Sequence, residues 1–215
     1  GITAGNGTLA VAYTRKGKEC SAEADKVLMA VGRRPNLGSL NLDEIGIAYT
    51  KKGITVDGEM RTSIPHIYAI GDINGINMLA HVATAQGVRA LNAICGEIDR
   101  MRLDVVPSAV FTMPEAATVG LTEDDCKERG IGFNVTKSFF RANGKAVCMG
   151  ETEGLCKLVS DSDGKLIGCH ILGAHSAGLE QEAAALITAG AAIDDLKRTI
   201  HAHPTLSEVV HAAAE

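Results

Sequence analysis

Two side chains that can exchange protons lie close together near the C-terminus, in the string HAHPTLSE at positions 201–208. His203 precedes a proline, and Glu208 follows on the first turn of an expected helix. A carboxylate that accepts the Nδ1 proton of an imidazole fixes its tautomer and leaves Nε2 free to exchange a proton. The pair can therefore work as a general base and the residue that orients it.

The same residues also fit a purely structural role. Thr205 and Glu208 have the spacing of a helix capping box, in which Glu208 only satisfies backbone donors. The residue types alone support the two interpretations equally. His201 has no comparable partner in the surrounding sequence, so we expect a neighbour without a catalytic role. Other histidines that lack such a partner pattern are His81, His170, His175 and His211.

A second candidate for chemistry is Asp72, which follows the apolar run Ile67–Ile70. That run predicts a buried strand, and a carboxylate at the end of such a strand faces the crevice where α/β sheets bind ligands. It could hold ribose-like hydroxyls, and the helix predicted over Leu79–Cys95 would aim its first N–H groups at the same place. A Gly–Asp pair after a strand is more often a plain turn, which the residues alone favour.

The elements that must position these residues change in character along the chain. The first half predicts three strands. The first covers Thr8–Thr14, and the second follows the turn at 15–18. The third covers Lys26–Gly32 and is expected to be a buried parallel strand. From about Pro107, short strands broken by turns predict an antiparallel sheet: Ser108–Met113, Phe133–Phe140, Leu155–Ser160 and Leu166–Leu172. Predicted helices there are Thr122–Arg129, Ala177–Ala192, Ile193–Thr199 and Leu206–Ala214.

Composition excludes several classes of protein. The chain has 215 residues, 46% hydrophobic, and a net charge of −5, so it lacks the cationic excess of nucleic-acid binders. No apolar run approaches the roughly 18 residues of a membrane span, and no basic start precedes an apolar stretch. We therefore expect a soluble, cytoplasmic protein. No two of the six cysteines form a C-x-x-C or C-x-x-x-x-C motif, which excludes the local redox and zinc motifs, so we expect no metal site. Six cysteines in 215 residues are sparse and no signal peptide points to secretion, which predicts reduced thiols.

Joined together, these stretches resemble the pyridine nucleotide-disulfide oxidoreductase family over nearly the whole chain. The string TSIPHIYAIGD at 62–72 is similar to its second flavin motif, and MLAH at 78–81 to the segment along the flavin ring. VGRRPN at 31–36 resembles the end of the NAD domain. The start of the dimerisation domain is resembled by residues 107–115 and 119–123. The string at 201–208 resembles dihydrolipoamide dehydrogenases in particular.

The resemblance implies an α/β plus α+β fold in three parts. Residues 1–34 would end an NAD-binding domain, 35–105 would be the C-terminal part of an FAD-binding domain, and 106–215 a dimerisation domain of antiparallel sheet and helices. It also implies roles for individual residues: His203 as the acid–base residue, Glu208 as its orienting partner, Asp72 on the flavin ribityl chain, Met78, Leu79 and Ala80 along the flavin, and Gly32 as a nucleotide contact.

The implied activity is oxidation of protein-bound dihydrolipoamide, with electrons passing through an active-site disulfide and FAD to NAD. The enzyme would be a homodimer in which the histidine reaches the disulfide of the opposite subunit. Its partners would be lipoyl domains of 2-oxo acid dehydrogenase or glycine cleavage complexes. Alternatives are another flavin disulfide reductase, of the glutathione or mercury type, and a stand-alone dimerisation module without catalysis.

The chain departs from the family pattern in two respects. It contains neither a G-x-G-x-x-G fingerprint nor the redox disulfide motif, and its first predicted strand has no preceding start signal. We therefore expect a truncated start and a dimer, inactive alone, that binds neither FAD nor NAD. Packing of Ala177–Ala192 against a twofold mate would bury the apolar face of that helix.

Overall fold

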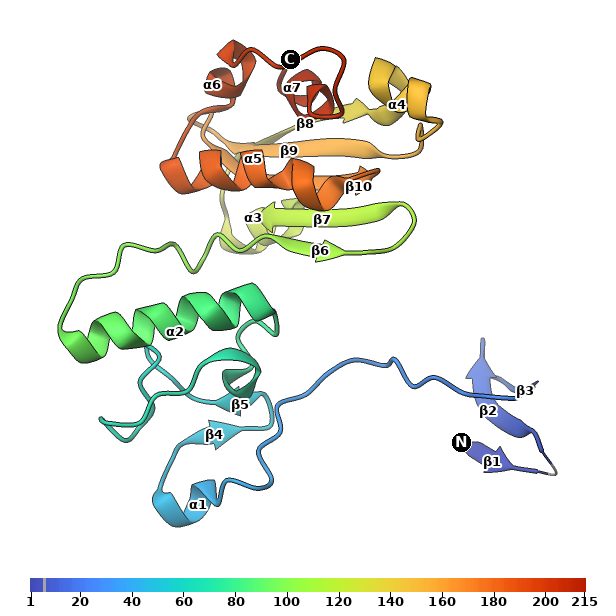
Figure 1. Ribbon diagram of the computed structural model, residues 1–215, viewed down its shortest axis with the longest axis vertical. Coiled ribbons are helices and arrows are strands. Elements are labelled where there is room, and N and C mark those ends of the chain that lie inside the picture. Colours follow the sequence, from blue (N-terminus) through green and yellow to red (C-terminus); the bar gives the residue numbers. More distant parts are fainter. Residues whose placement is uncertain (6) are drawn as a thin grey trace.

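The computed structural model of the chain describes residues 1–5 and 7–215 (Figure 1). Its N-terminal part is an antiparallel sheet in the order β1-β2-β3. The strands are β1 (Ile2–Ala4), β2 (Leu9–Arg15) and β3 (Lys18–Ala24). The two strands expected on either side of the turn at 15–18 are therefore present as β2 and β3.

The strand predicted over Lys26–Gly32 is not formed. This segment is an extended connection between β3 and the middle of the chain (Figure 1), and Leu28, Met29 and Val31 are 89%, 73% and 88% exposed. An apolar run becomes a strand only when neighbouring strands accept its hydrogen bonds. Within the described residues this run has no such neighbour.

The middle of the chain packs a small core of its own. Its elements are α1 (Leu42–Ile45), β4 (Tyr49–Thr50), β5 (Gly53–Ile54), the 3-10 helix η1 (Gly71–Asn74) and α2 (Ala80–Cys95). The predicted helix is present as α2, but the strand predicted over Ile67–Ile70 was wrong. That run makes a single bridge, between Arg61 and Tyr68, and Asp72 lies in η1 rather than at a strand end.

The C-terminal part is a five-stranded antiparallel sheet in the order β6-β7-β10-β9-β8. Its strands are β6 (Ser108–Val110), β7 (Glu115–Gly120), β8 (Phe133–Phe139), β9 (Leu155–Asp161) and β10 (Leu166–Gly173). Its helices are α3 (Glu123–Arg129), α4 (Gly144–Met149), α5 (Ser176–Ala189), α6 (Ile193–Arg198) and α7 (Glu208–Ala214), with the 3-10 turn η2 (Phe140–Ala142). The predicted antiparallel sheet with helices is confirmed. Strand β7 was not predicted, and β6 is shorter than expected.

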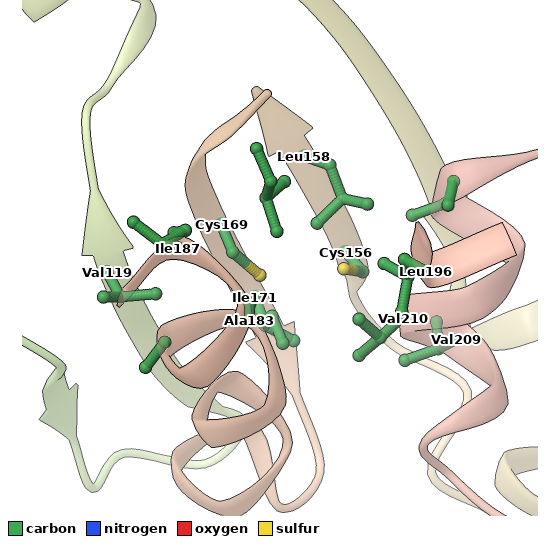
Figure 2. Packing of buried hydrophobic residues seen from close by; sticks show 14 of the residues in the cluster. Val119, Cys156, Leu158, Cys169, Ile171, Ala183, Ile187, Leu196, Val209 and Val210 are labelled. Atoms are coloured by element: carbon green, nitrogen blue, oxygen red, sulfur yellow. The ribbon is translucent and has the colours of Figure 1, made fainter. Parts of the chain in front are cut away.

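The main core lies between this sheet and helices α5, α6 and α7, as Figure 2 shows. Side chains from the strands, such as Leu158 and Ile171, meet Ala183 of α5 and Val210 of α7. The apolar face of α5 is therefore buried on its own sheet. Strands β7 and β10 cover this face, and packing of the remaining surface of α5 against a twofold mate stays a prediction.

One side chain in this core is acidic. Glu180 of α5 is 1% exposed, and its Oε2 atom has no hydrogen-bond partner in the described structure. Burial raises its pKa to about 7, although a hydrogen bond from the backbone of Thr118 opposes the shift. The carboxyl group therefore costs stability whenever it is ionised.

None of the helices in the described residues is both long and apolar enough to cross a membrane. The same residues contain no group of three or more His, Cys, Asp or Glu side chains placed to hold a metal ion.

Candidate active site

His203 lies on the loop before α7, and Glu208 is the first residue of that helix. His203 Nδ1 lies 2.9 Å from Glu208 Oε1, while Glu208 Oε2 accepts a 2.8 Å hydrogen bond from the backbone N–H of Thr205. The two interpretations of Glu208 are thus compatible, because one carboxylate oxygen orients the imidazole and the other satisfies a backbone donor. This geometry leaves His203 Nε2 without a hydrogen-bond partner in the described structure.

The electrostatics of the pair favour an ionised carboxylate. The pKa of Glu208 is lowered first by the Thr205 N–H and then by the hydrogen bond to His203. An ionised Glu208 holds the Nδ1 proton and stabilises the imidazolium that forms when Nε2 takes up a proton. The His203 side chain is 77% exposed, so an incoming group can reach Nε2.

A cavity of about 270 Å³ opens beside the pair. Its lining includes His203, Glu208, Ser138, Asn143 and His211. Asn143 is a buried polar residue whose Oδ1 caps α4 through the Ala146 N–H at 2.9 Å, while its Nδ2 donates to the carbonyl oxygen of Thr205 at 3.0 Å. Asn143 therefore fixes the part of the loop that follows His203.

His201 has a partner that the sequence analysis missed. Its Nε2 lies 2.9 Å from Glu182 Oε1 of α5, and its Nδ1 lies 3.0 Å from the carbonyl oxygen of Thr199. The side chain is 7% exposed. The expectation that His201 lacks a partner was wrong because Glu182 is brought to it by tertiary packing of α5 against the loop, which no local spacing reveals.

Asp72 lies in η1, next to the start of α2. Its carboxylate is 43% exposed and lies 3.4 Å from Arg33 Nη1, a surface ion pair that leaves it open to another partner. Gln86 of α2 holds η1 in place, since its Oε1 accepts hydrogen bonds from Gly71 N at 2.7 Å and from Asn74 Nδ2 at 2.8 Å. A Cβ at Gly71 would lie 3.0 Å from the Cβ of Ala83, so glycine permits this close approach.

Met78, Leu79 and Ala80 lead directly into α2. Leu79 is its N-cap residue and makes no side-chain cap hydrogen bond, so the first N–H groups of α2 can donate hydrogen bonds to an electron-rich ligand. Gly32 is exposed with a φ of 117° in the extended segment, adjacent to Arg33. In the described residues no hydrogen bond or ion pair joins this group to His203 and Glu208.

Comparison with known proteins defines the class of this chain. A model of the dimerisation domain of pyridine nucleotide-disulphide oxidoreductases matches residues 106–214, and a second model, of pyridine nucleotide-disulphide oxidoreductases, matches residues 2–87. The chain belongs to the pyridine nucleotide-disulphide oxidoreductase family.

Within that family, similar curated proteins are dihydrolipoyl dehydrogenases. The enzyme of Bacillus subtilis (strain 168) is 43% identical over 207 residues and that of Halobacterium salinarum is 41% identical over 212 residues. These alignments cover 95% and 98% of this chain but 44% and 45% of the two relatives. The chain therefore spans less than half the length of these relatives.

Solved structures agree with this placement. LpdA from Mycobacterium tuberculosis superposes with a TM-score of 0.89 at 29% identity, covering 99% of this chain and 46% of LpdA. The HOCl-induced flavoprotein disulfide reductase RclA from Escherichia coli gives 0.84 at 25% identity, covering 99% and 49%. The predicted family and fold class are confirmed, whereas the three domain boundaries and the roles of the site residues stay predictions.

Proposed function

We propose that this chain supplies the acid–base residue and the dimer interface of an FAD-dependent dihydrolipoyl dehydrogenase. The observation that carries the proposal is the His203–Glu208 pair, in which the carboxylate fixes Nδ1 while the ring stays open at Nε2. The similarity to dihydrolipoyl dehydrogenases supports the choice of substrate. The three predicted parts, 1–34, 35–105 and 106–215, are retained as the proposed domains.

In the proposed reaction, the substrate dithiol loses two electrons and two protons and closes to a disulfide. A thiolate is the reactive species, so a base must remove a thiol proton before the enzyme disulfide is attacked. His203 takes that proton at Nε2, and Glu208 stabilises the resulting imidazolium at Nδ1. FAD, when bound, supplies the route by which the two electrons reach NAD.

The described residues fit part of a flavin site. Asp72 presents a carboxylate that can accept hydrogen bonds from ribityl hydroxyls, and the uncapped start of α2 after Met78 and Leu79 presents N–H donors beside it. The fit is weaker for NAD, because Gly32 lies in an exposed extended segment, where a Cβ would meet no atom within 4 Å. We therefore assign FAD and NAD to the whole protein and expect this chain alone to retain neither.

Exposed apolar side chains support the proposed homodimer. On the face of the C-terminal sheet opposite the main core, a row of apolar residues crosses all five strands. Each of these residues is paired with the next one on the neighbouring strand, in the order Val110, Ala116, Leu172, Leu155 and Phe139. Val110, Leu172 and Phe139 are 56%, 43% and 38% exposed. Such a patch needs another protein surface to cover it.

Lipoyl domains of cytoplasmic 2-oxo acid dehydrogenase or glycine cleavage complexes are the proposed partners of the dimer.

The proposal is tested with the full-length protein. We expect visible flavin absorbance after purification and dihydrolipoamide-dependent formation of NADH. Reduction of glutathione disulfide or mercuric ion at a higher rate would favour another flavin disulfide reductase. A colourless full-length protein would instead favour a dimerisation module without catalysis.

We predict that Asp72→Ala weakens retention of FAD in the full-length protein. Loss of a hydrogen bond to a charged group is worth about 1.5–3 kcal/mol, which corresponds to roughly a 10- to 100-fold weaker affinity. Flavin absorbance after dialysis measures the effect, with Asp57→Ala as a control elsewhere in the same part of the chain. Stoichiometric FAD in dialysed Asp72→Ala would show that this carboxylate does not hold the cofactor.

A further inference from the structure

The chain just before His203 is mostly exposed and has few side-chain anchors, which are His201, the 2.7 Å hydrogen bond from Thr205 Oγ1 to the carbonyl oxygen of Ala202, and the contact of His211 with Lys197. From Lys197 to Pro204, His201 is the only residue that is not exposed, and its neighbour Ile200 is 98% exposed. The chain after His203, by contrast, is fixed by the hydrogen bonds of Thr205 to Glu208 and Asn143. The contacts of His201 are therefore those that join the first half of the loop to α5.

Both ring nitrogens of His201 face hydrogen-bond acceptors. Nε2 faces the Glu182 carboxylate and Nδ1 faces the carbonyl oxygen of Thr199. Because neither oxygen can donate, both hydrogen bonds form together only when each nitrogen carries a proton, as in an imidazolium. The contact with Glu182 is then a charge-assisted hydrogen bond, which is stronger than a neutral one.

Glu182 belongs to a firmly packed element. Its helix, α5, packs on β7 and β10. Ala183, the next residue, and Ile187, one turn later, both belong to the main core. The hydrogen bond from His201 to Glu182 therefore connects the exposed loop to a helix that packs on the main core.

Two carboxylates interact with His201, those of Glu182 and Glu208. The His211 ring of α7 lies 4.8 Å away, and His211 Nε2 contacts the carbonyl oxygen of Lys197 at 3.2 Å. After the Thr205 N–H and the hydrogen bond to His203, the nearby charge of His201 also lowers the pKa of Glu208. Glu182 is thus the acidic hydrogen-bond partner of the His201 side chain.

We propose that His201 and Glu182 are positioning residues, which together tether the loop so that His203 is held in the geometry needed for thiol–disulfide exchange. The tether itself follows from the contacts of His201, whereas its consequence for catalysis rests on the function proposed for His203. Neither residue touches the substrate in this proposal.

Two variants of Glu182 distinguish the hydrogen bond to His201 from the negative charge of the carboxylate. Glu182→Ala removes the acceptor of His201 Nε2. Glu182→Gln keeps a hydrogen bond, because a neutral His201 that donates through Nδ1 to Thr199 can accept at Nε2 from the amide. Gln181→Ala, an exposed change on the same helix, is the matched control.

The first measurement is hydrogen–deuterium exchange of the 215-residue chain. In Glu182→Ala we expect the amides of residues 199–203 to exchange roughly 10-fold faster, with the core strands unchanged. Glu182→Gln and Gln181→Ala should match the parent chain. Unchanged exchange of the loop in Glu182→Ala would overturn the tether, whatever the function of His203.

The second measurement is the rate at which dihydrolipoamide reduces the full-length protein. We expect roughly a 10-fold loss for Glu182→Ala, near-normal rates for Glu182→Gln, and no additional loss when Glu182→Ala is combined with His203→Gln. Reduction by NADH should be unaffected. Faster loop exchange with a normal rate, or losses that multiply in the double variant, would overturn the positioning role. A normal rate in His203→Gln would instead refute the proposed function.

Discussion

His203→Gln is expected to lower dihydrolipoamide-dependent reduction of NAD by roughly 10²–10⁴-fold in the full-length protein, the range typical of a lost general base. Glutamine keeps the polarity and approximate size of the side chain but cannot take up a proton at neutral pH. Flavin content and dimer formation should survive, because the His203 side chain is 77% exposed and contributes little to the core. Steady-state kinetics give the rate, and circular dichroism confirms the fold.

Two further variants identify what the loss means. Glu208→Gln should cost less than His203→Gln, since it weakens the orientation of the imidazole and leaves the base in place. His201→Gln should also cost less, because that residue acts through the loop. Near-normal turnover of His203→Gln, or a larger loss in His201→Gln, would return Glu208 to the role of a helix cap.

Glu180→Gln is expected to stabilise the chain at neutral and alkaline pH. Because the pKa of Glu180 is about 7 in the fold and 4.5 for a free glutamate, the folded state binds more protons between these values. Stability therefore falls as pH rises from about 4.5 to about 7 and stays low above that, by on the order of 3 kcal/mol. Glutamine is neutral at every pH and avoids this cost.

Urea unfolding followed by circular dichroism measures the difference. At about pH 5 the parent chain and Glu180→Gln should have similar free energies of unfolding, and at about pH 8 the variant should be more stable. Glu153→Gln, an exposed change, is the control and should show no such pH-dependent gain. An equal difference at both pH values would mean that Glu180 does not titrate in this range.

Local signals in the sequence predicted the elements that depend on local contacts. Helix α3 follows its N-cap residue Thr122, whose side chain accepts from the Asp125 N–H, and precedes Gly130, which adopts a left-handed conformation, as capping rules predict. The His203–Glu208 pair could be proposed for the same reason, because both residues belong to one turn and the following helix.

Signals that depend on distant partners failed. Strand β7 has the sequence EAATVG, whose small residues predict a strand poorly, yet it is paired on both sides by β6 and β10. Conversely, the apolar runs at Lys26–Gly32 and Ile67–Ile70 predict strands but find no sheet among the described residues. The contact between Glu182 and His201 could not be predicted from the sequence either, because only the tertiary fold brings α5 next to the loop.

The most direct test of the proposed site uses hybrid dimers of two inactive full-length variants. One variant carries His203→Gln, and the other lacks the redox disulfide. If His203 of one subunit serves the disulfide of its partner, each hybrid dimer contains one complete site, and random pairing should restore roughly a quarter of the wild-type dihydrolipoamide-dependent reduction of NAD. No recovery, with hybrid dimers demonstrated by native mass spectrometry, would contradict the account.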